Sequence, residues 1–144
     1  MARVKLIFPD KDPLFETKIP LRIGDMNYGN HLGNDRLLAL LHEARVQWLH
    51  SLKLSELDVG GCGLIMADVM IAYRQEGFYG DVLSVGLFTD AVARSSFDIL
   101  YKVTTERAGV TVAIADAKTG MAGFDYKNQK ISLLPDSLLR IMTG

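Results

Sequence analysis

The polar residues between Asp25 and Asn34 (DMNYGNHLGN) are the first candidates for chemistry in this chain. His31 is a candidate acid/base, because an imidazole can take a proton from water and return it. Asp25 is a candidate base or acidic partner of His31, and the Asn27 amide can orient a water molecule or hydrogen-bond a carbonyl. In an extended strand, Asp25 and Asn27 point from the same face. These three residues are the predicted catalytic group.

Two of these residues also have a purely structural interpretation. Asp25 fits a turn aspartate that accepts hydrogen bonds from backbone N–H groups. His31 fits a loop residue whose ring is bonded to the backbone.

The segment from Asp35 to Lys53 (DRLLALLHEARVQWLHSLK) must position this loop. Its apolar residues recur at three- and four-residue steps and cover most of the circumference, which predicts a helix buried on most sides. Asn34 is predicted to be the N-cap, because Asn is among the best capping residues. The first-turn N–H groups of a helix have no intrahelical partner and lie at the positive end of its dipole. They are suited to stabilise the oxyanion that forms when a carbonyl is attacked.

Five further segments have strand character, at residues 15–23, 63–73, 82–93, 97–104 and 110–124. Pro20 makes the first of them an edge strand or a strand with a bulge. Tight turns join the last four, among them the two-residue connection Ala108-Gly109, so the sheet is predicted to be antiparallel. Five strands and one apolar helix predict an α+β fold in which the sheet curls around the helix.

Asp68 is the only charged residue in the apolar strand Gly63–Tyr73. Such a continuous run predicts a strand covered on both faces, and a second copy of the chain is the simplest cover for the outer face. A homo-oligomer, dimer or tetramer, is therefore expected. A buried carboxylate must be paired or have its pKa raised. Asp68 is a candidate substrate contact or, alternatively, forms a salt bridge to Arg45 or to a second subunit.

The order of these elements, taken with the loop, resembles the hotdog-fold thioesterases, in the branch of 4-hydroxybenzoyl-CoA thioesterase and related acyl-CoA thioesterases. Members of that branch typically carry Asp-x-Asp, then a Gly-His-x-Asn-Asn-like turn, then a helix with Glu-Ala-Arg. The corresponding residues are Asp25-Met26-Asn27, Asn30-His31-Leu32-Gly33-Asn34 and Glu43-Ala44-Arg45, and the resemblance covers about residues 15–135. The second acidic residue of Asp-x-Asp usually serves there as nucleophile or general base. This chain has Asn27 in its place.

The resemblance implies a hotdog fold and hydrolysis of an acyl-CoA or acyl-carrier-protein thioester, without a metal or a cofactor. Asn34, Asp68 and the turn Arg94-Ser95-Ser96 are the candidate substrate contacts; the turn either binds a phosphate of the carrier or is a solvated turn. Two alternatives stay open. Asn27 favours a non-catalytic acyl-thioester-binding protein, and the pair Asp25 and His31 is a candidate for another hotdog reaction, such as hydration of an enoyl thioester.

Composition narrows the remaining classes of function. The chain has 144 residues and no Pro/Gly/Ser-rich linker, which predicts a single domain over 1–144, with an irregular arm over 1–13 and a short helix over 135–142. A net charge of −1 with scattered Lys and Arg argues against nucleic acid. No apolar stretch approaches the ~20 residues of a membrane span. Because Cys62 is the only cysteine and no secretory signal is evident, a cytoplasmic location is expected. The three histidines form no metal-binding pattern.

Overall fold

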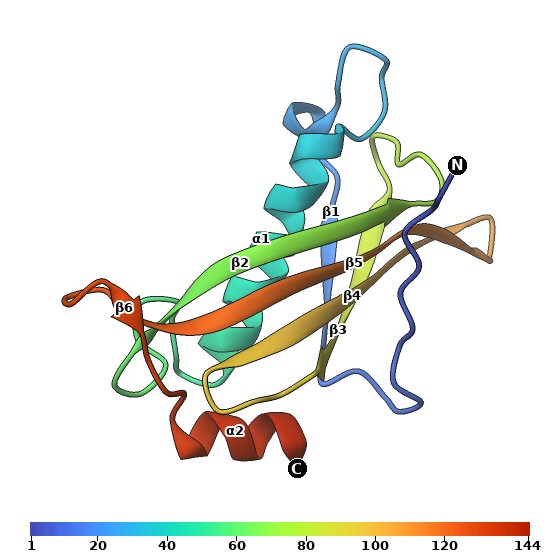
Figure 1. The fold of residues 1–144 in the computed structure, drawn as a ribbon. Helices are drawn as coiled ribbons and strands as arrows, with labels where there is room; N and C mark the ends of the chain where they lie inside the picture. The colour runs from blue at the N-terminus through green and yellow to red at the C-terminus, as the bar shows by residue number, and fades with distance from the viewer.

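The computed structural model describes residues 1–144 and shows one long helix lying across a twisted sheet (Figure 1). In chain order the elements are β1 (Phe15–Pro20), a 3-10 turn (Ile23–Asp25), α1 (Asn34–Ser51), β2 (Gly63–Tyr73), β3 (Val82–Asp90), β4 (Ser96–Arg107), β5 (Val110–Asp125), β6 (Lys130–Ile131) and α2 (Asp136–Thr143). The strand order is β1-β3-β4-β5-β2, with every pairing antiparallel and the short β6 added to β5. The predicted α+β class and antiparallel sheet are confirmed. The sequence did not predict β6.

The core lies between α1 and the sheet face that it covers. On β4 the alternating residues Phe97, Ile99, Tyr101 and Val103 are at most 1% exposed, as their period of two predicts. From α1, Trp48 and its neighbours on the same face belong to the same buried cluster. Helix and sheet therefore stabilise each other by burying these two apolar surfaces.

The β4–β5 hairpin confirms a predicted turn. Ala108 and Gly109 connect the two strands, and both have positive φ, +52° and +78°. This is the conformation of a two-residue turn that matches the twist of an antiparallel pair.

The start of α1 differs from the prediction. The N-cap is Gly33, not Asn34, because the first helical hydrogen bond runs from the Leu37 N–H to the Gly33 carbonyl, at 3.1 Å. Asn34 is the first residue inside the helix. Gly33 has no side chain to cap with, so the N–H groups of the first turn receive no side-chain acceptor.

The first strand is shorter than predicted. β1 ends at Pro20, and the Leu21 N–H turns toward the Asp81 carbonyl at 2.8 Å. Asp25 lies in a 3-10 turn. The expectation that Asp25 and Asn27 share one face of an extended strand is therefore wrong.

The bounds predicted for β2 are confirmed. β2 is the outer strand next to β5, and its register shifts between Met66 and Asp68. Its large apolar residues Ile65, Met66, Val69, Met70 and Tyr73 are 36–42% exposed in the single chain. β2 is thus a long, irregular edge strand, and the cover of its outer face by a second copy stays a prediction.

Asp68 pairs with Lys118 and not with Arg45. The Lys118 Nζ lies 2.8 Å from the Asp68 carboxylate, which also accepts the Gly120 N–H at 3.1 Å. The Lys118 hydrogen bond lowers the pKa of Asp68, so this carboxylate is ionised and not a buried acid. Arg45 instead binds Glu56 at 3.2 Å and donates to the Tyr101 hydroxyl at 3.0 Å.

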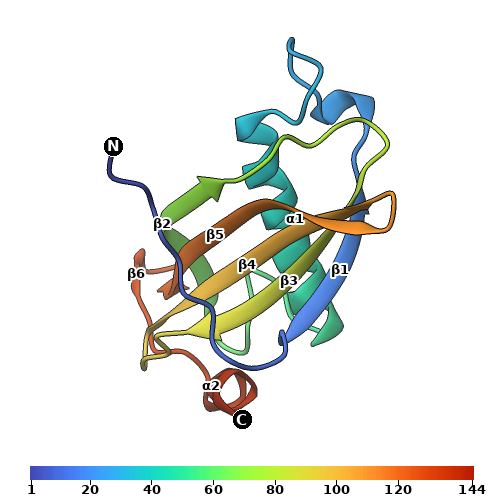
Figure 2. The same cartoon turned by 90° about the vertical axis from the view of Figure 1, so that its right-hand side faces the viewer.

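The two ends of the chain pack on the sheet from different sides. Residues 1–14 contain no helix or strand and run over the sheet face opposite α1 (Figure 2), where Phe8 meets Phe88 edge-on with ring centroids 5.2 Å apart. α2 begins one residue later than predicted, after Pro135 as N-cap, and buries Leu138 and Met142. None of the helices is long and apolar enough to cross a membrane.

Candidate functional site

The loop before α1 is fixed by backbone hydrogen bonds to itself and to the segment after β2. The Asn27 N–H donates to the His31 carbonyl at 2.8 Å, and the Leu32 N–H donates to the Gly77 carbonyl at 2.7 Å. A Cβ on Gly77 would lie 3.1 Å from the Leu21 side chain and 3.2 Å from the Leu32 side chain, so a larger residue would have to displace these side chains. The loop and the segment after β2 are therefore held as one unit.

The Asn27 side chain serves the loop itself. Its Oδ1 accepts the Gly29 N–H at 2.8 Å and the His31 N–H at 3.4 Å. This is the turn-forming geometry typical of Asn and Asp. Asn27 is close to His31 in space, but the Asn27 side-chain oxygen already accepts two backbone hydrogen bonds.

Asp25 lies on the other side of the loop. It is 4% exposed, and its carboxylate accepts the Arg22 N–H at 2.8 Å and lies 3.7 Å from the Arg22 Nε. It borders a groove between β1 and α1 together with Lys18, Arg36 and Glu43. The only carboxylate in ion-pair range of the His31 ring belongs to Glu76.

A pocket of about 170 Å³ opens where α1 begins. We call it the His31 pocket, and its lining is His31, Leu32, Gly33, Asn34, Leu37, Tyr73, Arg74, Gln75, Glu76, Gly77 and Ile114. The His31 side chain is 31% exposed; its Nδ1 lies 3.4 Å from the Leu32 carbonyl and its Nε2 lies 3.8 Å from the Glu76 carboxylate. The Leu32 carbonyl and the Glu76 carboxylate can both only accept hydrogen bonds. In the tautomer that donates from Nδ1 to the Leu32 carbonyl, Nε2 carries the lone pair and is the nitrogen nearer Glu76.

The positive end of α1 lies in the same pocket. The N–H groups of Asn34, Asp35 and Arg36 have no acceptor within the chain, and Asn34 and Gly33 line the wall. The Tyr73 hydroxyl donates to the Asn34 carbonyl at 3.1 Å. Burial, and then the charge of Asp35, raise the pKa of Tyr73, so its hydroxyl remains a proton donor at neutral pH. The pocket thus combines unpaired donors with a base.

Glu76 is the site residue that sequence reasoning missed. It follows a strand end in a segment without any periodic pattern, where a solvated glutamate is the natural expectation. The fold brings it to His31 because Arg107, at the end of β4, donates to the Glu76 carbonyl at 2.7 Å. Arg107 also pairs with Asp81 and lies over the Phe78 ring, 4.9 Å from its centroid. The Arg107 hydrogen bond lowers the pKa of Asp81, so this pair is charged at neutral pH.

The turn Arg94-Ser95-Ser96 lies at the opposite end of the sheet, near α2 (Figure 1). The carbonyls of Arg94 and Ser95 accept the N–H groups of Leu134 and Gly123, at 2.8 and 2.9 Å. The twelve residues of β4 separate this turn from Arg107, a distance of about 36 Å along an extended strand. Within one chain, His31 and Asn34 therefore line the same pocket, and this turn lies far from it. Asp68 lies at the middle of β2.

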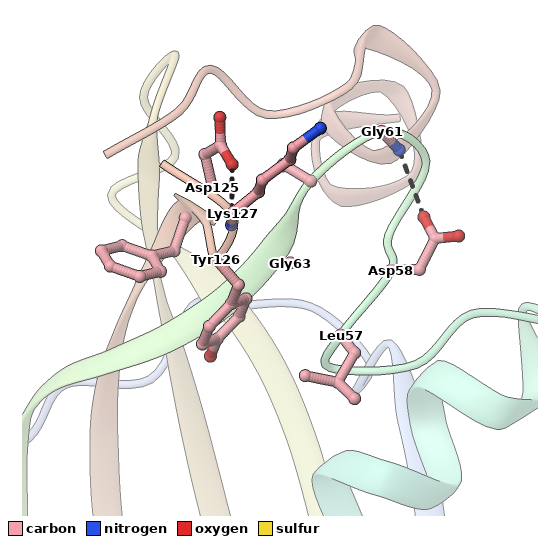
Figure 3. Close-up of a pocket in the computed structure, with 9 residues that line it drawn as sticks. Leu57, Asp58, Gly61, Gly63, Asp125, Tyr126 and Lys127 are labelled. Atoms are coloured by element: carbon pink, nitrogen blue, oxygen red, sulfur yellow. Dashed lines mark hydrogen bonds between the residues drawn. The ribbon is translucent and has the colours of Figure 1, made fainter. Parts of the chain in front are cut away.

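A larger pocket, of about 340 Å³, lies where β2 begins, and we call it the Asp58 pocket (Figure 3). Its lining is Leu57, Asp58, Gly61, Cys62, Gly63, Phe124, Asp125, Tyr126 and Lys127. Asp58 accepts the N–H groups of Gly60 and Gly61, and Asp125 accepts the Lys127 N–H at 3.0 Å. These and neighbouring hydrogen bonds lower the pKa of both carboxylates. The Asp58 pocket contains no histidine, and both carboxylates are bonded to nearby backbone, so the His31 pocket is the better candidate for chemistry.

Comparison with known proteins decides the family. Residues 21–142 match the model of a family described as the thioesterase-like superfamily. The chain belongs to this superfamily. No curated protein matches it significantly in sequence.

Solved structures of the same fold support the assignment. The chain is similar to a 1,4-dihydroxy-2-naphthoyl-CoA thioesterase from Synechocystis, with a TM-score of 0.78, 21% identity and coverage of 89% of this chain and 94% of that one. It is also similar to a variant of 4-hydroxybenzoyl-CoA thioesterase in complex with 4-hydroxybenzoyl-CoA, with a TM-score of 0.79, 14% identity and coverage of 90% and 98%. A gentisyl-coenzyme A thioesterase matches with a TM-score of 0.76, 14% identity and coverage of 90% and 100%. The expected hotdog fold is thereby confirmed.

Proposed function

We propose that this protein hydrolyses an acyl-CoA or acyl-carrier-protein thioester to the free acid and the thiol. The observation that carries the proposal is that His31 lines one pocket with Asn34, the first residue of α1, whose backbone N–H has no acceptor within the chain. A base next to preorganised oxyanion donors is what acyl transfer to water requires. The membership in the thioesterase-like superfamily favours this chemistry over others.

In the proposed reaction, His31 Nε2 takes a proton from a water molecule while the water oxygen forms a bond to the thioester carbonyl carbon. The carbonyl electron pair moves onto its oxygen, which the N–H groups at the start of α1 stabilise. Loss of one such donor typically costs about 3–4 kcal/mol in the transition state. The intermediate then collapses with cleavage of the C–S bond, and the proton on Nε2 passes to the leaving sulfur. The products are a carboxylic acid and a thiol.

Asp25 and Asn27 act in this proposal by shaping the loop. The Asn27 oxygen orders the turn that presents His31, and Asp25 is committed to Arg22. In this proposal the base is His31 and not the second residue of the Asp-x-Asp position. The reaction therefore does not need a carboxylate at residue 27.

We also propose that the protein works as a homo-oligomer, and that it acts on a soluble thioester without a cofactor. β2 is a long edge strand with exposed apolar side chains, which is an edge that natural proteins normally cover. Arg94, Ser95 and Ser96 are too far from the His31 pocket of their own chain to hold the carrier of a substrate bound there. If they bind its phosphates, they do so from another copy. Asp68 is not part of the lining of the His31 pocket of its own chain, so as a substrate contact it would also have to act from another copy.

The experiment that tests the activity is a panel of aromatic and aliphatic acyl-CoA and acyl-carrier thioesters, assayed for release of free thiol. Thiol release above the uncatalysed rate supports the proposal. Tight binding of an acyl-CoA without turnover would establish the non-catalytic binder instead. Loss of the enoyl absorbance without thiol release would establish hydration.

Sedimentation equilibrium tests the oligomer. A species of at least twice the 15.9 kDa chain mass is expected at micromolar concentration. A stable monomer would contradict the proposed assembly, and with it any phosphate contact by the Arg94-Ser95-Ser96 turn.

A further inference from the structure

Glu76 and His31 approach each other from two parts of the chain that are far apart in sequence. The Glu76 Oε1 and the His31 Nε2 are 3.8 Å apart, and both residues line the His31 pocket. The Glu76 side chain is 61% exposed and has no hydrogen bond to any other group in the chain. This separation is longer than a direct hydrogen bond, but catalytic contacts are often long before substrate binds and shorten in the complex.

The backbone of Glu76 is held in place by several independent contacts. Arg107 donates to its carbonyl, and the charged pair of Arg107 with Asp81 fixes the guanidinium. On the other side, the carbonyl of the next residue, Gly77, accepts the Leu32 N–H from the loop that carries His31. These two contacts fix the backbone position from which the Glu76 side chain reaches toward His31.

We propose that Glu76 is a positioning residue for His31, supplying the carboxylate that the Asp-x-Asp position of this chain lacks. The inference rests on the proposed function. Nδ1 of His31 is oriented by the Leu32 carbonyl, while the Glu76 carboxylate faces Nε2. When Nε2 takes the proton of the attacking water, the imidazole becomes a cation directly beside this carboxylate. The attraction stabilises the transition state and disappears once Nε2 gives the proton to the leaving sulfur.

The other charged and titratable groups at the pocket do not replace Glu76. Arg74, from the same segment, pairs with Asp116 on β5 at 2.8 Å. Asp35, in the first turn of α1, lies close enough to Tyr73 to raise its pKa. Asp25 is bonded to Arg22. Glu76 is the carboxylate within ion-pair distance of the imidazole.

The test compares the wild type with Glu76→Gln, Glu76→Asp and the matched control Glu16→Gln, an exposed carboxylate on β1 outside the His31 pocket. Each variant is assayed for kcat and KM with the best thioester of the panel, and Glu76→Gln is repeated in a His31→Ala background. Two opposite charges about 4 Å apart in water change a rate roughly fivefold or more. We therefore expect Glu76→Gln to lower kcat about fivefold or more with KM little changed. Glu76→Asp should retain more activity than Glu76→Gln, and Glu16→Gln should equal the wild type.

The His31→Ala background separates a role through the imidazole from a general structural role. If Glu76 acts through His31, adding Glu76→Gln to His31→Ala causes no further loss. An equal loss in both backgrounds, or a Glu76→Gln variant as active as the wild type, would overturn the assignment while leaving the hydrolase activity intact. A wild type that hydrolyses no thioester would remove the proposed function and this inference together.

Discussion

β2 begins at the Asp58 pocket and ends at the His31 pocket, and the two pockets use similar residues to different effect. At its start, Asp58 and Asp125 accept N–H groups from residues two or three positions away, which lowers the pKa of both. At its end, the Glu76 carboxylate and the His31 Nε2 have no hydrogen-bond partner in the chain and face each other. A carboxylate already bonded to the backbone stabilises a turn, whereas one left free beside an imidazole is available for chemistry.

The difference arises from sequence distance. The carboxylates of the Asp58 pocket bind their own turns, and no tertiary contact is needed to satisfy them. Glu76 and His31 are brought together only because the Leu32–Gly77 and Arg107–Glu76 backbone contacts hold two separate segments side by side. Pairs of this kind exist only in the folded chain, and the variants below test whether the two pockets differ as described.

The largest effect is expected from removal of the base. His31→Ala should lower kcat by about 10²–10⁴-fold, the usual contribution of general acid–base catalysis. The side chain is 31% exposed, so its truncation leaves no buried cavity and the melting temperature should change little. Steady-state kinetics and a thermal melt measure both. Activity that persists within a factor of two would remove His31 from the reaction.

Trp48→Ala should destabilise the whole fold, because Trp48 lies on the buried face of α1 in its C-terminal half and is 2% exposed. Truncating a buried tryptophan typically costs about 3–5 kcal/mol of unfolding free energy. Denaturant titration followed by far-UV circular dichroism measures the loss. An unchanged midpoint would be incompatible with α1 as the buried centre of the fold.

Asn27→Asp tests whether residue 27 only shapes the loop or can act as the general base. A carboxylate can accept the Gly29 and His31 N–H groups as the amide oxygen does, so the fold should be retained. Turnover should change by less than about tenfold. A rise within the range of about 10²–10⁴ that a general base provides would show instead that residue 27 reaches the reacting carbonyl and that the wild type lacks only its carboxylate.

The smallest effect is expected at the Asp58 pocket. Asp58→Asn should leave kcat and KM unchanged and lower the melting temperature slightly at neutral pH. Because hydrogen bonds lower the pKa of Asp58 in the folded state, its stabilising contribution is present above the ordinary carboxyl value of about 4 and is lost as the pH falls through the lowered value. The difference in melting temperature between the wild type and Asp58→Asn should therefore shrink in acid. A loss of turnover would mean that the Asp58 pocket takes part in the reaction.

Much of the fold was predictable from local patterns. The period of two in β4, the helical period of α1 and the Ala108-Gly109 turn each depend on residues close in sequence, and the structure shows all three. The resemblance to hotdog thioesterases added the family, which the match over residues 21–142 confirms. The wrong predictions concern places where contacts with another segment of the chain determine the local structure. Pro20 ends β1 where the Leu21 N–H turns to the Asp81 carbonyl, and the 3-10 turn at Asp25 removes this residue from the strand.

For the candidate site, the sequence by itself determined which residues can do chemistry near α1, because a turn-rich polar loop before an apolar helix is a local feature. It singled out His31 and the free N–H groups of the helix start. Only the tertiary structure decided which carboxylate accompanies His31. Asp25, six residues away, is turned to Arg22, and Glu76, forty-five residues away, faces the ring. The physical reason is that two side chains interact when they are close in space. Here the hydrogen bonds to the Gly77 and Glu76 carbonyls determine that distance, and no periodic pattern in the sequence predicts it.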